Sequence, residues 1–365
     1  MRVSRLEAIL ESFGRRRVLV LGDCMLDVHL WGRATRISPE APVMVVEEER
    51  TTYAAGGASN VAANLVAMGA GAAIVAVVGN DPEALQLREQ LESLGVSARG
   101  LVADPDRPTT TKTRIIAHNQ QIVRVDREAT SRVSPLVERA LADRVREALA
   151  DTDVLILSDY CKGVMTEGLV SAVVRLARGA GRPVLCNAKP ANASCFRDVD
   201  LLTVNQSEAE AITGERIRDD RSLRGAGERL LAASGGRGVF ITRGGQGIAV
   251  FGPQGTFHQV AGITEEVFDV AGAGDSVVAA AALALLGGAT LEEAATLANY
   301  AGNAKVRKVG VVPVTREEIR AIWEMNEARG ERPGYESRRT GHATSDASHR
   351  RTGVGPHGDI RPSDE

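Results

Sequence analysis

The stretch Phe268-Asp-Val-Ala-Gly-Ala-Gly-Asp-Ser-Val-Val-Ala-Ala-Ala-Ala282 decides most about the fold and the site. A strand is expected to end at 266–270, a tight turn to follow at Gly272-Ala273-Gly274, and an alanine-rich helix after it. Such a turn presents backbone N–H groups and the positive end of the helix dipole, which suit an anion. Asp275 lies in the same first turn. There a carboxylate either caps the helix or acts as a base beside developing phosphate charge, and the turn alone leaves both open.

The composition is that of a soluble globular protein with an aliphatic core. Hydrophobic residues make up 44% of the 365 residues, and aromatic residues only 3%. This length suffices for one large α/β domain or two smaller ones. A net charge of -3 gives no general attraction to nucleic acid or to an anionic membrane.

Several features favour a cytoplasmic protein. Residues 1–14 read as an amphipathic helix without the apolar core of a signal peptide, and the longest apolar runs are too short to span a membrane. The four cysteines form no CxxC pair, so we expect reduced thiols in a cytoplasm.

Buried strands alternate with helices along most of the chain. The expected strands are 17–22, 72–78, 97–102, 154–159, 183–187, 201–205 and 237–242, and the expected helices are 1–14, 54–68, 82–94, 134–150, 166–179 and 207–212. This alternation predicts an α/β fold, with a doubly wound, mostly parallel sheet and helices on both faces.

Three segments depart from this alternation. Residues 30–53 and 109–126 have strand-like patterns without helices, with a turn at 118–120. They predict a small separate β-sheet, which we interpret as a lid and as a candidate homodimer contact. Residues 328–365 carry too few apolar side chains to fold, so we expect a disordered polar tail after a domain at 1–327.

Polar side chains lie at or just after the predicted strand ends. They are Asp27, Asn187, Lys189, Asn205, Glu208, Thr242, Arg243 and Asp275. Because the carboxyl ends of parallel strands share one sheet edge, we expect these groups to converge in one crevice. A lysine, a glutamate suited to hydrated Mg²⁺ and a carboxylate beside an anion cradle are what phosphoryl transfer requires.

Other polar residues allow two interpretations each. Asp23 could simply cap a turn. For Asp27 we favour the interpretation that it contacts a substrate. Gly56, Gly57 and Asn60 either open a helix without a ligand or let backbone and amide approach the hydroxyls of a polyol.

These motifs resemble those of the PfkB (ribokinase-like) sugar kinases. Asp269-Val-Ala-Gly-Ala-Gly-Asp275 is similar to their D-T-x-G-A-G-D signature, Asn205-Gln-Ser-Glu208 to N-x-x-E, and 54–64 to their G-G-x-x-x-N signature. Over about residues 8–322 the chain is similar to the D-glycero-β-D-manno-heptose-7-phosphate kinases, including the kinase half of the bifunctional enzyme. This similarity rests on the motifs Gly22-Asp-Cys-Met-Leu-Asp27, Arg36-Ile-Ser-Pro-Glu-Ala-Pro-Val43, Gly56-Gly-Ala-Ser-Asn60, Asn119-Gln-Gln-Ile-Val-Arg-Val-Asp126 and Leu157-Ser-Asp-Tyr-Cys-Lys-Gly163.

The resemblance implies ATP-dependent phosphorylation of the anomeric C1 hydroxyl of heptose 7-phosphate. The 1,7-bisphosphate would feed ADP-heptose synthesis, for lipopolysaccharide or another heptose-containing glycan. Asp275 would be the general base and Gly272, Ala273 and Gly274 the anion hole.

The resemblance also implies the binding residues. The substrate would contact Asp27, Gly56, Gly57, Asn60, Arg124 and Lys162, with Arg124 or Lys162 facing the 7-phosphate. The nucleotide would contact Lys189, Asn205, Glu208, Thr242, Arg243, Gly244, Gly247 and Asn299. Asn205 and Glu208 would hold Mg²⁺, through water, and a monovalent cation is a further candidate cofactor.

The sequence departs from the family pattern at four places. Val270 and Ala271 stand at threonine positions, Asn187-Ala188 replaces an Asp-Pro, and Val311 stands where Thr or Ser is frequent. The H-x-G-H element of the nucleotidyltransferase half is missing from the sequence, so we expect kinase activity only.

Three other functions remain to be weighed. One is another PfkB kinase, acting on ribose, fructose 6-phosphate or a nucleoside, which the motifs at 36–43 and 119–126 disfavour. Another is a non-catalytic sugar-binding regulator, which the presence of Asp275 and Glu208 disfavours. A Rossmann dehydrogenase is disfavoured because no G-x-G-x-x-G follows the first strand.

Overall fold

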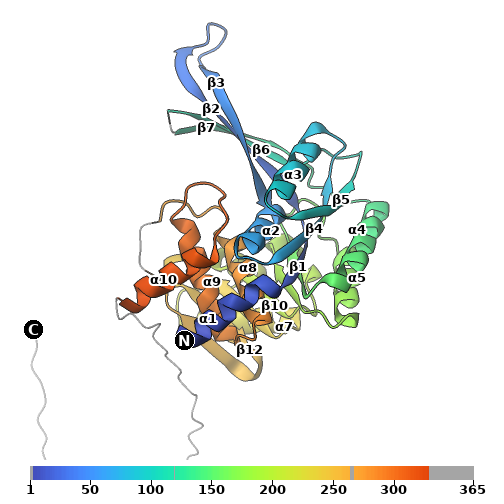
Figure 1. The fold of residues 1–365 in the computed structure, drawn as a ribbon, viewed down its shortest axis with the longest axis vertical. Helices are drawn as coiled ribbons and strands as arrows, with labels where there is room; N and C mark the ends of the chain where they lie inside the picture. Colours follow the sequence, from blue (N-terminus) through green and yellow to red (C-terminus); the bar gives the residue numbers. More distant parts are fainter. Residues whose placement is uncertain (1–2, 119, 264–266, 329–365) are drawn as a thin grey trace, which may run out of the picture.

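The computed structural model describes residues 3–118, 120–263 and 267–328, and a nine-stranded sheet forms its centre (Figure 1). The strand order is β13-β12-β11-β10-β9-β8-β1-β4-β5. The strands are β1 (Arg17–Gly22), β4 (Gly71–Val78), β5 (Ser97–Ala103), β8 (Val154–Ser158), β9 (Val184–Asn187), β10 (Leu201–Asn205), β11 (Gly238–Thr242), β12 (Ile248–Gly252) and β13 (Thr256–Val260). All neighbours from β5 to β11 are parallel, and β12 and β13 extend the sheet antiparallel. The predicted doubly wound, mostly parallel sheet is confirmed.

Helices cover both faces of this sheet. They are α1 (Val3–Ser12), α2 (Ala58–Ala67), α3 (Pro82–Ser93), α4 (Pro135–Ala148), α5 (Glu167–Gly179), α6 (Gln206–Thr213), α7 (Asp220–Ser234), α8 (Ala273–Leu286), α9 (Leu291–Val306) and α10 (Arg316–Ala328), with short 3₁₀ helices η1 (Phe13–Arg15), η2 (Leu149–Asp151), η3 (Pro190–Cys195), η4 (Gly244–Gln246) and η5 (Pro253–Gly255). In β1, Val18 and Val20 pack into one hydrophobic cluster and Leu19 and Leu21 into the other. Alternate side chains therefore supply two cores, as a sheet buried on both faces requires.

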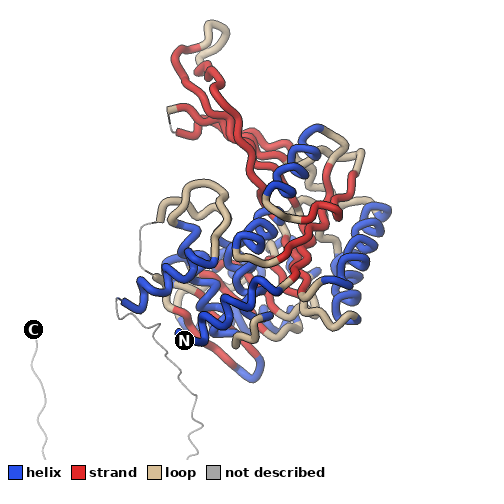
Figure 2. Tube along the Cα trace, viewed as in Figure 1, coloured by secondary structure: helices blue, strands red, loops and turns tan. Residues whose placement is uncertain are grey.

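A second sheet projects from this body as a lid (Figure 2). Its order is β3-β2-β6-β7, formed by β2 (Cys24–Ile37), β3 (Met44–Gly57), β6 (Thr111–Ala117) and β7 (Gln120–Arg127). Only Asp23 separates β1 from β2, and β3 runs directly into α2. The lid strands are thus continuous with the elements that form the core. The predicted small β-sheet is confirmed.

Several local predictions were wrong. Residues 267–270 form a loop rather than the end of a strand, and Glu266 lies outside the described residues. The helix expected from residue 54 begins at Ala58, because Gly56 and Gly57 pair with β2 and end β3. Asp27 lies within β2 instead of following a strand end, since the chain re-enters a strand immediately after Asp23.

Other elements were missed or fall outside the described residues. Helices α7, α9 and α10 and the antiparallel pair β12–β13 were not predicted from the sequence. Of the tail expected at 328–365, Ala328 is the last residue of α10, and 329–365 lie outside the described residues. In the turn expected at 118–120, His118 has a positive φ of 51° and Gln120 starts β7, while residue 119 lies outside the described residues.

Two further properties concern the cysteines and the apolar helices. The four cysteines are free thiols, as expected. Within the described ranges, no helix combines the length and apolarity needed to cross a membrane.

Candidate active site

A cavity of about 570 Å³ opens at the carboxyl edge of the main sheet. The ends of β9, β10 and β11, the start of α8 and the end of α9 all line it. The predicted residues on its wall are Asn187, Lys189, Asn205, Glu208, Thr242, Gly244, Gly247, Asn299, Gly272, Ala273, Gly274 and Asp275. The structure therefore brings together most of the predicted nucleotide residues and the whole predicted anion hole.

Asp275 is buried at the start of α8, with 3% of its surface exposed. Its carboxylate accepts a hydrogen bond from Asn60 Nδ2 at 2.6 Å and another from the hydroxyl of Tyr160. Its side-chain bonds thus run to α2 and to the loop after β8, not to the helix backbone, so Asp275 is not a helix cap.

The surroundings of Asp275 tune its proton affinity. Burial raises the pKa of this carboxyl to about 6, while the hydrogen bonds from Tyr160 and Asn60 and the charge of Lys189 act in the opposite direction. Asp27 adds a negative charge nearby and raises the pKa further. A carboxylate with a pKa about 6 is ionised at neutral pH and still able to accept a proton, which suits a general base.

The turn before α8 can only be built with a glycine at its corner. Gly272 precedes the helix with a φ of 79°, and a Cβ there would lie 2.7 Å from Asn60 Nδ2. The positive φ and this close approach both exclude a side chain. The positive end of the α8 dipole consequently meets the cavity at Gly272-Ala273-Gly274, where it favours an anion.

The N-x-x-E element also has a structural role, which is to cap a helix. Asn205 Oδ1 accepts from the Glu208 N–H and Glu208 Oε2 from the Asn205 N–H, both at 2.8 Å. This capping box starts α6. The other Glu208 oxygen forms an ion pair with the ammonium of Lys189.

The side chains around Glu208 fit an Mg²⁺ ion that is bound by a single carboxylate, with water and phosphates as its other ligands. In the described part of the chain, no three His, Cys, Asp or Glu side chains cluster so that they could hold a metal ion. Mg²⁺ is commonly bound by one or two carboxylates, with water and substrate phosphates completing its shell. Glu208 fits such an ion, whereas the Asn205 side-chain oxygen is already engaged in the cap.

Four predicted substrate residues lie outside the wall of the cavity, on α2 and the lid. Asp27 is buried in β2 and pairs with the guanidinium of Arg114. A Cβ on Gly56 would overlap the Asp27 carboxylate, so that glycine makes room for it, and Gly57 is the residue before α2, with a φ of 60°. Asn60 donates a hydrogen bond to Asp275, which places the amide of this predicted substrate residue next to the predicted base.

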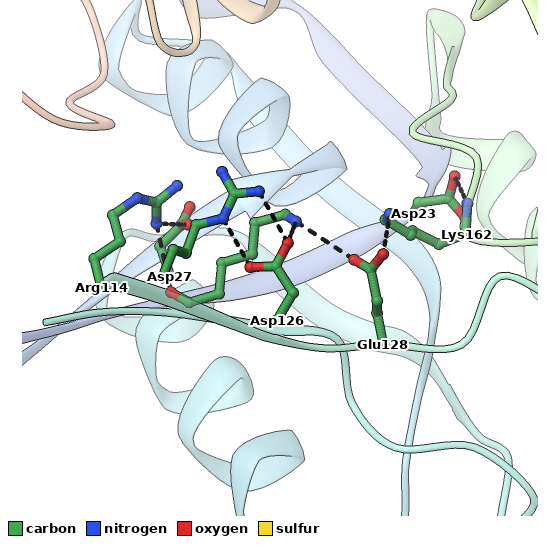
Figure 3. A network of polar contacts seen from close by, with 8 residues as sticks. Asp23, Asp27, Arg114, Asp126, Glu128 and Lys162 are labelled. Carbon is green, nitrogen blue, oxygen red and sulfur yellow. Dashed lines mark hydrogen bonds and ion pairs between the residues drawn. The ribbon is translucent and has the colours of Figure 1, made fainter. Parts of the chain in front are cut away.

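The two predicted 7-phosphate ligands belong to a chain of ion pairs (Figure 3). Arg124 is 48% exposed on β7 and pairs with Asp126 at 2.8 Å. Lys112 contacts Asp126 at 2.8 Å and Glu128 at 3.4 Å, and Lys162 contacts Glu128 at 2.8 Å. This network connects the lid to the loop after β8.

One predicted residue faces elsewhere. Arg243 donates hydrogen bonds to Gln206 and Gln259, each at 3.4 Å, and does not line the cavity. Its position directly after β11 placed it near the sheet edge, but the side chain turns toward α6 and β13.

Two residues of the site were missed. Tyr160 lines the cavity and donates to Asp275, and Lys189 lies 5.5 Å from the centre of its ring. Tyr160 lies two residues after the end of β8, so the strand-end rule could have found it. Arg114 was missed because its contact with Asp27 depends on the parallel register of β2 and β6.

Comparison with known proteins agrees with this geometry. Residues 15–318 match the profile of the pfkB family carbohydrate kinases. The chain is 42% identical over 319 residues to the bifunctional protein HldE of Geobacter sulfurreducens, which covers 87% of this chain and 65% of the relative. It is 44% identical over 301 residues to HldE of Geobacter metallireducens, which covers 82% and 61%. The chain thus spans somewhat less than two thirds of the length of these relatives.

Solved structures share the fold. Phosphofructokinase-2 from Escherichia coli, in complex with potassium, has a TM-score of 0.71 at 19% identity and covers 86% of this chain and 99% of that one. Ribokinase from Arabidopsis thaliana, complexed with ribose and ATP, has a TM-score of 0.65 at 19% identity and covers 84% and 98%.

The hydroxyl of Tyr160 should lower the proton affinity of Asp275. In the native protein we expect the Asp275 carboxyl to titrate near the pKa of about 6. Tyr160→Phe should move this titration to higher pH, because it removes a hydrogen bond that stabilises the carboxylate. Carbon NMR of protein labelled at the aspartate carboxyls measures this, with the signal assigned from Asp275→Asn. Tyr53→Phe, on the exposed lid, is the control, and an unchanged or lower midpoint in Tyr160→Phe would refute the expectation.

Proposed function

The chain belongs to the pfkB family of carbohydrate kinases, and we propose that it phosphorylates the anomeric C1 hydroxyl of D-glycero-β-D-manno-heptose 7-phosphate with ATP. The observation that carries the kinase chemistry is the buried Asp275 carboxylate, held at the positive end of α8 beside the cavity. The choice of heptose 7-phosphate rests on the motifs at 36–43 and 119–126, which resemble those of the heptose kinases.

Asp275 would remove the proton from the attacking hydroxyl. Its pKa of about 6 leaves it ionised at neutral pH. Asn60 and Tyr160 occupy one lone pair on each oxygen, and a carboxylate has about four such positions, so a sugar hydroxyl can still donate to it. Asn60 and Tyr160 would hold the base in one orientation during the transfer.

The start of α8 and Lys189 would stabilise the transferred phosphoryl group. The N-terminal end of the helix and the Gly272-Ala273-Gly274 turn offer a preorganised positive potential where negative charge develops. Lys189 lies on the same wall and would contact the phosphates of ATP. Glu208 would hold Mg²⁺ through water, and the ion would supply charge neutralisation between the phosphates.

The lid would close the sugar side of the site. Asp27 lies in β2 and Gly56 in β3, and both strands run directly into the core. We infer that the sugar lies between Asp27, Asn60 and the lid network, with its 7-phosphate toward Arg124 or Lys162. Closure would exclude water, which otherwise competes as acceptor of the phosphoryl group.

We also propose that two copies pair through their lids. The lid exposes apolar side chains that a monomer leaves in water, including Val43, Met44, Val123 and Val125. Val125, for example, is 55% exposed. Exposed apolar side chains on a projecting sheet are typical of an interaction surface.

The identity of the sugar and the role of Asp275 can be tested together. We expect ATP and Mg²⁺ to support turnover of heptose 7-phosphate, but not of sedoheptulose 7-phosphate, fructose 6-phosphate, ribose or adenosine. Asp275→Asn should lower kcat by roughly 10²-fold or more, because general-base catalysis contributes about that much, while calorimetry should show that sugar binding is retained. Asp143→Asn, which changes an exposed carboxylate on α4, is the matched control.

The outcomes separate the competing functions. Turnover of a different sugar, lost in Asp275→Asn, would keep the kinase mechanism and reject the heptose assignment. Sugar binding without turnover of any candidate would favour a non-catalytic regulator. Unchanged turnover in Asp275→Asn would remove Asp275 from the role of base.

Recognition of the 7-phosphate should depend on the lid network. Arg124→Met or Lys162→Met should raise KM for heptose 7-phosphate by about tenfold or more, since a hydrogen bond to a charged group contributes about 1.5–3 kcal/mol. The kcat should change little, because the phosphate is remote from the reacting hydroxyl. Arg33→Met, in an exposed lid ion pair with Glu49, is the control. An unchanged KM in both test variants would place the phosphate elsewhere.

The lid contact predicts a concentration-dependent dimer. Sedimentation analysis should give a dimer for the native chain and a monomer for Val125→Asp, because a buried unpaired carboxylate disfavours the interface. Leu136→Asp, at an exposed apolar position on α4, should leave the dimer intact. A native monomer at all concentrations, or a dimer that survives Val125→Asp, would contradict this.

A further inference from the structure

A lysine is buried beside the loop that leads into α8. Lys305 lies in the last turn of α9 and is 1% exposed, although lysine is almost never fully buried unless its charge is paired. Its ammonium donates hydrogen bonds to two backbone carbonyls, that of Asp269 at 3.1 Å and that of Lys308 at 3.2 Å. These carbonyls belong to the loop before α8 and the loop after α9. The ammonium therefore joins the two loops from the inside.

Asp269 reinforces the same junction from the other side. Its carboxylate accepts from the Ala271 N–H at 2.9 Å and from the Gly310 N–H at 2.8 Å. Burial alone would raise the pKa of Asp269, but these two bonds and the charge of Lys305 lower it overall. The carboxylate is consequently ionised near neutral pH and offsets the charge of the buried ammonium.

This arrangement has the chemistry of a site for a monovalent cation. Backbone carbonyl oxygens that converge away from water replace the hydration shell of an ion such as K⁺. The family resemblance makes a monovalent cation a candidate cofactor of this protein. Between the carbonyls of Asp269 and Lys308, however, the space is filled by the ammonium of Lys305. A free ion does not fit at this point.

We propose that the Lys305 ammonium serves as a built-in monovalent cation that fixes the loop leading into the Gly272-Ala273-Gly274 turn. Asp269 is three residues from Gly272, so the position of its carbonyl determines how the chain enters the turn. Without the ammonium, two carbonyls would face each other in a dry space with no donor between them, which costs free energy. The protein should thus keep this loop ordered without added K⁺.

Thermal unfolding tests the proposal without any substrate. The Tm of the native protein should be the same, within about 1 °C, in KCl and in choline chloride of equal ionic strength, since no ion site is left to fill. Lys305→Ala opens the space, so its Tm in choline chloride should fall by about 5 °C or more. KCl or NH₄Cl should then restore part of that loss, because the ion binds only the folded state.

Two variants serve as controls. Lys305→Met removes the charge but keeps the space filled, so its Tm should fall without recovery in KCl. Lys308→Met removes an ammonium that contacts Pro313 and Glu318 instead, and any loss of stability there should be equal in both salts.

The activity assay adds a second readout, and only this part rests on the proposed function. Native turnover should be equal in the two salts, while Lys305→Ala should be activated by K⁺ about tenfold or more, as expected for an ion that restores a positioned loop. A native enzyme whose Tm or turnover rises specifically with K⁺ would overturn the proposal, as would a folded Lys305→Ala that responds equally to both salts. If Lys305→Ala does not fold, the comparison of the native protein in KCl and in choline chloride still tests the proposal. A protein without kinase activity would reject the proposed function and leave the Tm test in force.

Discussion

The other parts of the site depend on the hydrogen bonds that the buried carboxylate of Asp23 accepts. It accepts the N–H groups of Tyr160 at 2.8 Å, Lys162 at 3.1 Å and Val164 at 3.2 Å, so it determines the shape of the loop after β8. Its own backbone bonds to Ser158 and Ala58. One residue thereby ties together the end of β1, the start of the lid, the start of α2 and the loop that carries Tyr160. An unpaired carboxylate at 1% exposure would be costly, which makes this geometry close to obligatory.

The surroundings of Asp275 follow from this junction. Tyr160 reaches Asp275 from the loop that Asp23 holds, and Asn60 reaches it from the first turn of α2. Burial raises the pKa of Asp275, and the two hydrogen bonds keep that rise limited. On the opposite side, Lys305 and Asp269 fix the loop that enters α8. Asp275 and the Gly272-Ala273-Gly274 turn are therefore held from three directions by groups that are themselves hydrogen-bonded.

Much of this could be predicted from the sequence. The alternation of buried strands and helices specified the parallel sheet, since each strand is apolar on both faces and bounded by turn residues. The strand-end rule gathered Lys189, Asn205, Glu208 and Thr242 on one edge, where the cavity lies. It failed for Arg243, whose long side chain turns away from the cavity, and for Asp27, which lies within a lid strand. It placed Asp275 correctly only because the turn before α8, rather than a strand, brings it to that edge.

The sequence by itself determined the chemistry available: a glycine turn before an alanine-rich helix, a carboxylate three residues into it, and the lysine and glutamate of the neighbouring strand ends. These are local properties, set by backbone preferences and by residue types at fixed spacing. Only the tertiary structure decided how each group is used. It gave Asp275 its partners Asn60 and Tyr160, paired Arg114 with Asp27, and turned Lys305 inward between two loops. The physical reason is that burial, pKa and hydrogen-bond partners depend on residues that are distant in the chain, and no local pattern encodes those distances.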